Sequence, residues 1–319
     1  MRTLIKQLIK NFLARLGYTY TLFTLPVAAP ALDGDVIAIY DRQGRVPWSP
    51  IYDRVRGEAV RQLLISPARM GPFRSGAALP PGYGVGIDER CVEYPWVLAR
   101  IQANDLHLMD AGSALNHPYV LASLMQPGRS LHVVTLAPES YRMVDARLSY
   151  FYCDLRDLFF VREAAYDVVA RVSTLEHVGM DNQAFTRHAG SSEVSTTRGE
   201  VAALEEMWRI VKPGGRLLIT LPFGRRGDFG TFRQYDQDTL KTLLDSVPNA
   251  QVDLTYFRYR KEGWNRARAE ECADADYMPW CMLPAATRGS QPPREPDLAA
   301  AARAVACIEL IKNSPNPGC

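Results

Sequence analysis

Four titratable residues follow apolar runs of the sequence, where buried strands are expected to end. They are Asp110, Asp154 and the adjacent pair Glu176 and His177. A charged group at the end of an apolar strand is costly to bury unless a ligand or hydrogen-bond partner satisfies it. Imidazole titrates near neutral pH, and a carboxylate can accept a proton. Glu176 and His177 are therefore candidates for acid–base catalysis, and Asp110 and Asp154 for ligand binding.

The segment after Asp110 has the composition of a tight turn that a ligand can approach. It consists of the small residues Ala111, Gly112, Ser113 and Ala114 and leads into an expected helix. Glycine lets a ligand come close to the backbone. An acidic residue at the carboxyl end of a parallel strand is typical of doubly wound sheets that hold nucleotide-like cofactors. We expect Asp110, Ala111, Gly112 and Ser113 to bind such a cofactor.

The elements that would position these residues alternate between strands and helices. Apolar runs predict strands at 106–109, 130–137, 147–154, 166–178 and 216–224, and helical periodicity predicts a helix at 199–212. Residues 213–215, Pro-Gly-Gly, end that helix. The flanking Lys212 and Arg216 are expected to be solvated. This alternation predicts parallel strands joined by crossover helices, hence a doubly wound α/β domain with its sites at the carboxyl ends of the strands.

The C-terminal part predicts a helix at 234–247 and two further strands at 250–259 and 304–312. No crossover helix separates these strands, so we expect antiparallel neighbours at a sheet edge. The insertion 260–303 is rich in charge, proline and aromatic residues and is expected to be either a substrate-facing lid or a surface loop. The tail 313–319 is expected to be disordered.

Residues 1–32 are expected to form a helix and a linker. Apolar side chains at 1–16 fall on one helical face and Arg and Lys side chains on the other, which predicts an amphipathic basic helix. Such a helix either binds the surface of an anionic membrane or packs on protein. We therefore expect a cytoplasmic protein, with peripheral contact to the inner face of the membrane as one alternative.

Residues 33–85 show weak patterns and are expected to be an N-terminal appendage to the α/β domain, which spans 86–312. A short strand is predicted at 35–41 and a helix at 56–65. A further helix is predicted within 86–101, where a charged cluster precedes an aromatic run. The charges of this cluster are either solvated at the helix start or functional; they are Asp88, Glu89, Arg90 and Glu93.

The composition excludes several classes of protein. An apolar fraction of 47% is ordinary for a globular domain. A net charge of +2 argues against a dedicated nucleic-acid binder, which usually carries a concentrated basic surface. The six cysteines show no CxxC spacing and no Cys/His pair at metal-ligand spacing. We expect free thiols in a reducing compartment and no metal site.

Motifs at the ends of these elements resemble those of the class I S-adenosylmethionine-dependent methyltransferases. They are DAGSALN at 110–116, CDLRDL at 153–158, YDVVARVSTLEHVG at 166–179 and EEMWRIVKPGGRLLITLPFG at 205–224. The resemblance spans residues 86–312. It implies a Rossmann-like seven-stranded sheet whose last strand is antiparallel, and an enzyme that uses S-adenosylmethionine. It also implies cofactor contacts from Asp154, Leu155 and Ser173.

A narrower resemblance is to methyltransferases encoded among bacterial cell-surface polysaccharide genes. It rests on VEYPWVLARI, DAGSALNHP, STLEHVG, TLPFG and FRQYD. It implies O-methyl transfer to a hydroxyl of a glycan or related small acceptor. Glu176 or His177 would take the proton; the alternative for both is a structural role. The candidates for acceptor contact are Arg233, Tyr235, His188 and Trp264.

The chain departs from the family pattern at two positions. Residue 114 is Ala where the family has Gly, and the second strand ends in Thr-Leu-Ala-Pro-Glu where the family has an acid that binds the ribose. Glu139 is our candidate for that contact. Two other functions stay open: a membrane-associated scaffold that has lost the reaction, and a nicotinamide-dependent oxidoreductase. The oxidoreductase is disfavoured because no GxGxxG follows Asp110.

Overall fold

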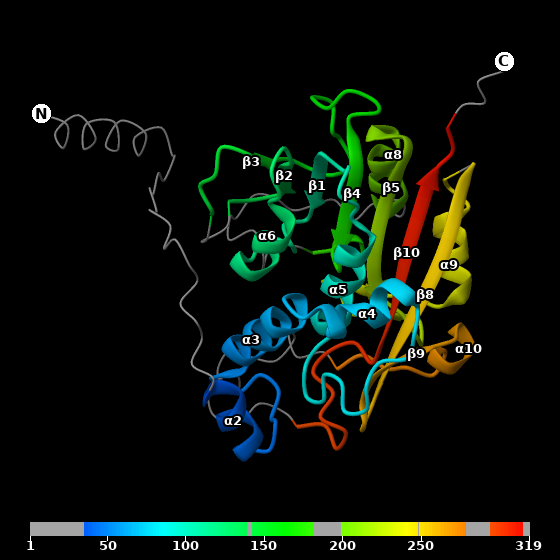
Figure 1. Cartoon of the computed structure of the whole chain (residues 1–319). Helices are drawn as coiled ribbons and strands as arrows, with labels where there is room; N and C mark the ends of the chain where they lie inside the picture. The colour runs from blue at the N-terminus through cyan, green and yellow to red at the C-terminus, as the bar shows by residue number, and fades with distance from the viewer. Residues whose placement is uncertain (1–34, 139–141, 182–198, 248, 279–293, 315–319) are drawn as a thin grey trace, which may run out of the picture.

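The computed structural model describes residues 35–138, 142–181, 199–247, 249–278 and 294–314. These residues form an eight-stranded sheet in the order β3-β2-β1-β4-β5-β10-β8-β9, with helices on both faces (Figure 1). The predicted α/β class with a Rossmann-like sheet is confirmed. The predicted basic helix at 1–16 and most of the tail lie outside the described residues.

The five apolar runs of the sequence give five parallel strands. Each strand overlaps a predicted one: β1 His107–Ala111, β2 Ser130–Thr135, β3 Leu148–Tyr152, β4 Tyr166–Val172 and β5 Val211–Pro222. Parallel strands covered by helices on both faces need apolar side chains on both faces, so they appear in the sequence as continuous apolar runs. In β4, all seven residues except Asp167 are buried.

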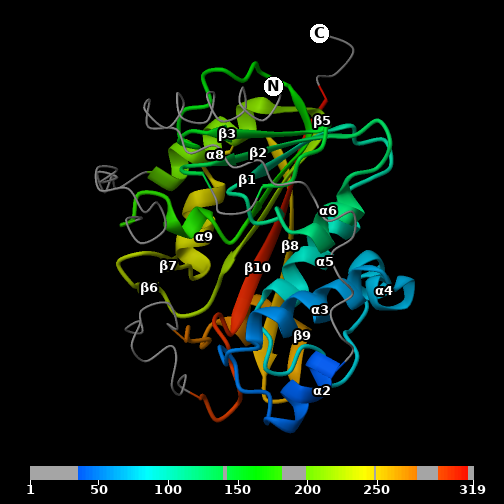
Figure 2. The ribbon, with the colours of Figure 1, turned by 90° about the vertical axis from the view of Figure 1, so that its left-hand side faces the viewer.

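The C-terminal strands are antiparallel, as predicted. β8 (Ala250–Arg260) pairs antiparallel with β10 (Ala304–Lys312), and β10 lies between β5 and β8. β9 (Gly263–Ala267) forms a hairpin with β8 at the start of the insertion, so the sheet has eight strands where seven were expected. Figure 2 shows the twist of this sheet: β1, β2 and β3 run across the view, whereas β10 runs steeply.

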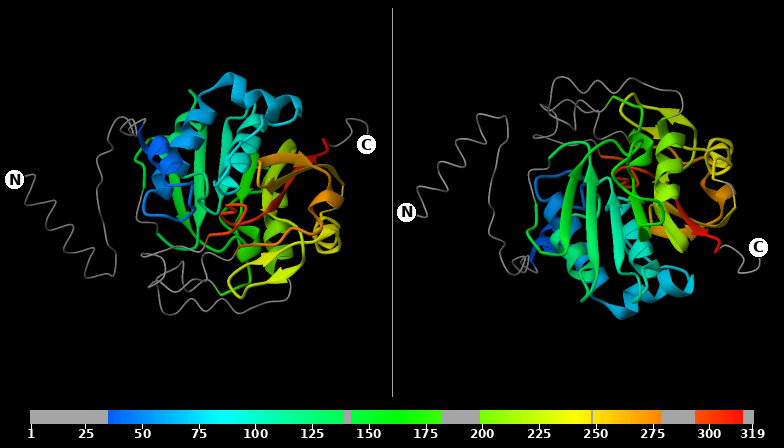
Figure 3. Two further views of the ribbon diagram at one scale, coloured as in Figure 1. Left: turned by 90° about the horizontal axis from the view of Figure 1, so that it is seen from below. Right: turned by 90° about the horizontal axis from the view of Figure 1, so that it is seen from above.

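The sheet separates two apolar cores, and Figure 3 shows helices on both sides of the sheet. The helices on one face are α3 (Tyr52–Leu64), α4 (Pro67–Ser75), α5 (Arg90–Arg100) and α6 (Pro118–Leu124), and those on the other are α8 (Gly199–Ile210) and α9 (Gln237–Leu244). Successive side chains of a strand point to opposite faces. Leu108 of β1 therefore belongs to the first core and its neighbour Met109 to the second.

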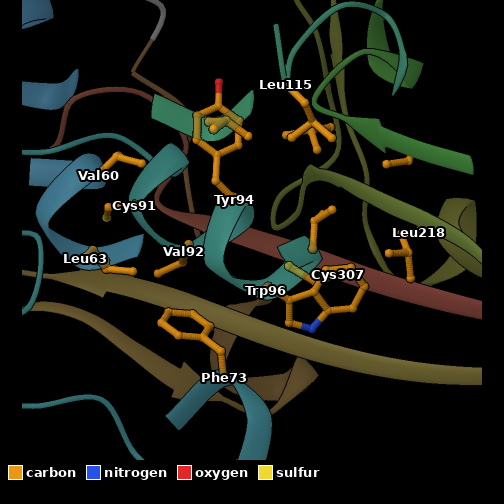
Figure 4. Packing of buried hydrophobic residues seen from close by; sticks show 14 of the residues in the cluster. Val60, Leu63, Phe73, Cys91, Val92, Tyr94, Trp96, Leu115, Leu218 and Cys307 are labelled. Atoms are coloured by element: carbon orange, nitrogen blue, oxygen red, sulfur yellow. The ribbon is translucent and has the colours of Figure 1, made fainter. Parts of the chain in front are cut away.

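Helix α5, which leads into β1, is buried on all sides. Its residues 91–97 are all buried. Figure 4 shows Tyr94 and Trp96 among side chains that come from α3, α4 and the sheet. Phe73 of α4 belongs to the same cluster, so residues 33–85 contribute to a core that they share with the sheet. A helix buried all round is normally apolar all round. The one acidic residue of α5, Glu93, therefore requires an explanation from its surroundings.

The short strand predicted at 35–41 is wrong, because this segment forms helix α2 (Asp35–Arg42). Val36 and Tyr40 lie one helical turn apart, and both are buried against Tyr52 and Val55 of α3. The β-branched residues of the segment favour a strand by propensity. Packing of the Val36–Tyr40 face outweighs that preference.

The expectation of solvated charges at Lys212 and Arg216 is also wrong. Arg216 is buried and forms an ion pair with the buried Asp105. Lys212 forms an ion pair with Asp167 of β4, at 2.6 Å. Both residues belong to β5, which begins before the Pro-Gly-Gly segment. Their ion pairs therefore connect β5 to β4 and to the segment before β1 at the amino-terminal edge of the parallel strands.

We searched the described part of the chain for transmembrane helices, metal-binding groups and free thiols. None of its helices has the length and apolar character of a transmembrane span. Within it, no group of three or more His, Cys, Asp and Glu side chains is placed to hold a metal ion. Four of the cysteines are free thiols: Cys91, Cys153, Cys272 and Cys307.

Candidate functional site

The carboxyl ends of β1, β4 and β5 meet at one edge of the sheet, where most of the predicted site residues lie. At the end of β1, Asp110 is fully buried, and its Oδ2 accepts a hydrogen bond from the backbone N–H of Leu115 at 2.9 Å. The backbone N–H of Gly112 donates to the carbonyl oxygen of Val134 at 2.8 Å. Asp110 therefore closes the turn from Ala111 to Leu115 and holds it against β2.

This turn has a conformation that requires a small residue at Gly112. Gly112 has φ +125° and Ser113 φ +64°. A Cβ atom at Gly112 would lie 2.3 Å from Oγ1 of Thr174, so the turn packs directly on the segment that follows β4. The Ser113 Oγ is buried and has no hydrogen-bond partner among the described residues. An unpaired buried hydroxyl is costly, and it suits a polar ligand held at this turn.

Ser173 follows β4 and is held in an unusual backbone conformation. Its φ is +39°, its N–H donates to the carbonyl oxygen of Thr220 at 3.0 Å, and its hydroxyl donates to Oε1 of Glu93 at 2.6 Å. The predicted cofactor residue thus has its hydroxyl proton committed to a protein carboxylate. Only the lone pairs of that oxygen and the neighbouring backbone are left for a ligand.

Glu176 lies in the short helix η1 (Leu175–His177), directly after this turn. Its side chain is 3% exposed, and its Oε2 has no hydrogen-bond partner among the described residues. Burial, and next the negative charge of Glu93, raise the pKa of Glu176 to about 8. A carboxyl group whose pKa lies near physiological pH can exchange a proton with an acceptor.

His177 is held in a defined tautomer. Its Nδ1 lies 2.7 Å from the carbonyl oxygen of Thr231. A carbonyl oxygen only accepts, so Nδ1 carries the proton of the neutral ring and Nε2 is the basic nitrogen. Burial lowers the pKa of His177 to about 4, against the opposing effect of the Thr231 carbonyl. The ring is therefore neutral at physiological pH.

Asp154 and Leu155 follow β3. Leu155 is buried. The Asp154 carboxylate accepts hydrogen bonds from the backbone N–H of Arg156 at 2.8 Å and from its guanidinium. Burial raises the pKa of Asp154, but the hydrogen bonds from Arg156 outweigh burial and leave that pKa below its usual value. Asp154 is thus an ionised residue that shapes the turn after β3.

The residues predicted to contact the acceptor do not all lie at the same place in the structure. Arg233 lies on β7 (Arg233–Gln234) and forms an ion pair with Glu200 at 2.6 Å. Tyr235 follows it and is buried, and its hydroxyl has no partner among the described residues. Trp264 is not brought to this edge: it is fully buried on β9, and its Nε1 donates to the carbonyl oxygen of Ile87. His188 and Glu139 lie outside the described residues.

The structure adds three residues of the 88–93 cluster to this edge. Glu93 contacts Ser173 and Thr220, Arg90 forms an ion pair with Glu93, and Glu89 is buried with its Oε2 unpartnered among the described residues. Burial, and next the charge of Asp88, raise the pKa of Glu89. Charged residues inside an apolar helical run were the signal, but the sequence does not tell a buried helix from a solvated helix start.

Known structures resemble this chain at low identity. No protein-family model matches it, and no curated protein matches it in sequence. One similar structure is 1,6-didemethyltoxoflavin-N1-methyltransferase from Burkholderia thailandensis, which contains bound 1,6-didemethyltoxoflavin and S-adenosylhomocysteine. It is 14% identical over 92% of this chain and 94% of that chain, with a TM-score of 0.39.

Two further structures show the same level of likeness. A SAM-dependent methyltransferase from Archaeoglobus fulgidus is 13% identical over 68% of this chain and 94% of that chain, with a TM-score of 0.41. Phosphoethanolamine N-methyltransferase 2 from Haemonchus contortus is 11% identical over 67% of this chain and 50% of that chain, with a TM-score of 0.38. These TM-scores are too low to support the fold assignment, which rests on the strand order of the sheet.

Proposed function

We propose that the chain is an S-adenosylmethionine-dependent methyltransferase that transfers a methyl group to a hydroxyl of a glycan or a related small acceptor. One observation carries the proposal. The turn closed by Asp110 packs on Thr174, two residues before the buried Glu176, at the carboxyl edge of a sheet whose antiparallel β10 lies between β5 and β8. A cofactor turn and an acid–base group are thus neighbours at the edge where such sheets bind ligands.

The residues of the β1 turn suit this cofactor. Ala111, Gly112 and Ser113 offer a backbone without bulky side chains, and the buried Ser113 hydroxyl lacks a partner among the described residues. Asp154 and Leu155 would lie toward the adenine side, and Glu139 is the candidate for the ribose. When bound, S-adenosylmethionine supplies a methyl group on a positively charged sulfur. The chain contributes the alignment of an acceptor oxygen with that methyl group.

The acceptor hydroxyl has to lose its proton as its oxygen gains the methyl group, and Glu176 is the group we assign to receive it. Its ionised form is the base, so with a pKa of about 8 the rate should rise with pH through about 8. His177, with a pKa of about 4, would give a rise near 4 instead. The pH profile of kcat/KM therefore distinguishes the two candidates. Arg233 and Tyr235 are the proposed acceptor contacts.

Titration calorimetry with S-adenosylmethionine and with NAD tests the cofactor. We expect binding of S-adenosylmethionine alone, and transfer of a labelled methyl group to a hydroxylated acceptor from a panel of sugars and sugar nucleotides. Binding of NAD alone would favour an oxidoreductase. Binding of neither compound would contradict both enzyme proposals and favour the non-catalytic scaffold protein. An acceptor methylated on nitrogen would keep the cofactor and overturn the hydroxyl chemistry.

The proposed glycan acceptor also suggests where in the cell the protein acts. A glycan precursor at the inner face of the membrane would suit a cytoplasmic enzyme whose residues 1–16 contact anionic lipid. We expect the full chain to sediment with liposomes that contain anionic lipid, and a chain without residues 1–16 to stay in the supernatant. Equal sedimentation of the two chains would remove the membrane contact from the proposal.

A further inference from the structure

Glu93 joins three elements at the carboxyl edge of the sheet. Its Oε1 accepts hydrogen bonds from the Ser173 hydroxyl at 2.6 Å and from the Thr220 hydroxyl at 2.7 Å. Its Oε2 forms an ion pair with Arg90, one turn earlier on α5. The side chain is completely buried, at 0% exposure. A single buried carboxylate therefore connects α5, the end of β4 and β5.

We propose that Glu93 is a positioning residue, which ties α5 to the carboxyl ends of β4 and β5 and sets the charge environment of Glu176. The proposal rests on the proposed function, in which Glu176 receives the acceptor proton. It adds a residue that touches neither acceptor nor cofactor and acts through its neighbours.

The positioning half of this role follows from the strain at Ser173. A non-glycine residue at φ +39° is costly and persists only when its surroundings hold it. The Ser173 hydroxyl is held by Glu93, and Thr220, which bonds the same carboxylate, also accepts the Ser173 N–H. Glu176 is three residues further along the chain. The direction in which η1 leaves β4 thus depends on the Glu93 carboxylate.

The electrostatic half follows from the charges that surround Glu176. Burial and the negative charge of Glu93 raise its pKa, whereas the positive charges of Arg90 and Arg171 lower it. Arg90 is paired with Glu93, so its effect on Glu176 is partly cancelled. The other titratable groups on the elements that pack against η1 are His177 on η1 itself, Glu200 on α8, Arg233 on β7 and Tyr235 directly after β7. Arg233 and Glu200 pair with each other, which leaves Glu93 as the charge whose removal has the largest effect.

The variant Glu93→Gln keeps the shape of the side chain and removes its charge. We expect the pKa of Glu176 to fall by about one unit or more, because a like charge is lost and Arg90 is freed from its partner. Infrared difference titration measures this pKa directly, with Glu176→Gln identifying the carboxyl band. Arg90→Met should move the same pKa upward, because it leaves Glu93 without its counter-charge. Because the two variants shift the pKa of Glu176 in opposite directions, either one tests the proposal if the other folds poorly.

Glu58→Gln is the matched control. Glu58 is also buried and also pairs with an arginine three residues away, Arg61 on α3. Loss of that ion pair should lower the melting temperature without moving the pKa of Glu176. A drop in melting temperature alone is therefore the signature of a structural role, and a shift of the Glu176 band is the signature of positioning.

The outcomes separate this inference from the proposed function. If Glu93→Gln folds and leaves the Glu176 titration where it is in the native chain, the inference is overturned, whatever the cofactor results show. If the titration moves as expected but calorimetry detects no S-adenosylmethionine, the positioning role stands and the methyltransferase proposal fails. Rescue by Glu93→Asp with a near-native Glu176 pKa would support a requirement for the charge.

Discussion

Gly112→Ala is expected to abolish binding of S-adenosylmethionine and to lower the free energy of unfolding by about 3 kcal/mol. At φ +125° a residue with a side chain is strained, and the added Cβ would lie 2.3 Å from Oγ1 and 2.4 Å from Cγ2 of Thr174. The methyl group would therefore force the β1 turn away from the segment that carries Glu176. Denaturant unfolding measures the stability, and titration calorimetry measures the binding.

Two variants separate strain from a general effect of adding a methyl group. Gly71→Ala lies within α4, where the added Cβ meets no atom within 4 Å outside its chain neighbours and the backbone of the helix, so we expect it to be neutral or to stabilise by up to about 1 kcal/mol. Gly112→Ala combined with Thr174→Gly removes the clash but not the strained φ, so it should recover part of the loss. Native affinity for S-adenosylmethionine in Gly112→Ala would show that the cofactor does not bind at this turn.

The strands of the sheet could be predicted because each one contains a run of several apolar residues. In β4 five of the seven residues are apolar, and the carboxyl-terminal half of β5 is apolar except for Thr220, so a shift of one position leaves the pattern intact. The antiparallel pairing of β8 with β10 followed from the missing crossover helix between them. β9 escaped prediction because five residues with exposed polar positions, Gly263–Ala267, do not differ from a loop in composition.

Single residues were harder to place than elements. Trp264 was expected at the acceptor, because exposed aromatic rings suit sugars, but its ring is buried against Tyr259. Its position depends on the β8–β9 hairpin, which no local pattern reveals. Asp110 was expected to bind a ligand, and the structure gives its Oδ2 a partner within the chain, the backbone N–H of Leu115. Its influence on a cofactor would then pass through the turn.

Glu93 shows why the rest of the site escaped the sequence. It lies 80 residues from Ser173 and 127 residues from Thr220, so only the fold brings these side chains together. Within α5 it is surrounded by apolar residues, a pattern that fits either a solvated helix face or a buried polar contact. The strand ends locate the edge of the sheet, whereas the network that supports Glu176 depends on how α5 crosses that edge.

Glu176→Gln is expected to abolish most methyl transfer and to make the protein more stable at alkaline pH. Glutamine resembles the protonated carboxyl group in shape but cannot take a proton from the acceptor, so transfer should fall about 100-fold or more. The stability effect comes from burial. The pKa of Glu176 is raised from 4.5 to about 8, so the ionised form is the one that the fold disfavours.

The direction of the pH dependence follows from proton counting. Below about pH 4.5 the carboxyl group is protonated in the folded and the unfolded chain and contributes nothing. Between about 4.5 and about 8 the folded chain holds a proton that the unfolded chain has lost, so the free energy of unfolding falls as pH rises. Glutamine does not titrate, so the variant lacks this slope. Between about pH 6 and about pH 9, its stability relative to the native chain should rise by about 3 kcal/mol.

Urea unfolding at a series of pH values measures this difference, and Glu205→Gln is the control. Glu205 is an exposed carboxylate on α8, so its replacement should leave the slope of the native chain unchanged. Glu89 also has a raised pKa, but it is present in every one of these chains and cancels in the comparison. If native and Glu176→Gln chains lose stability in parallel as pH rises, Glu176 is ionised in the folded protein at neutral pH. The pKa of Glu176 would then not be raised, and the rise of the methyl-transfer rate near pH 8 would no longer be expected.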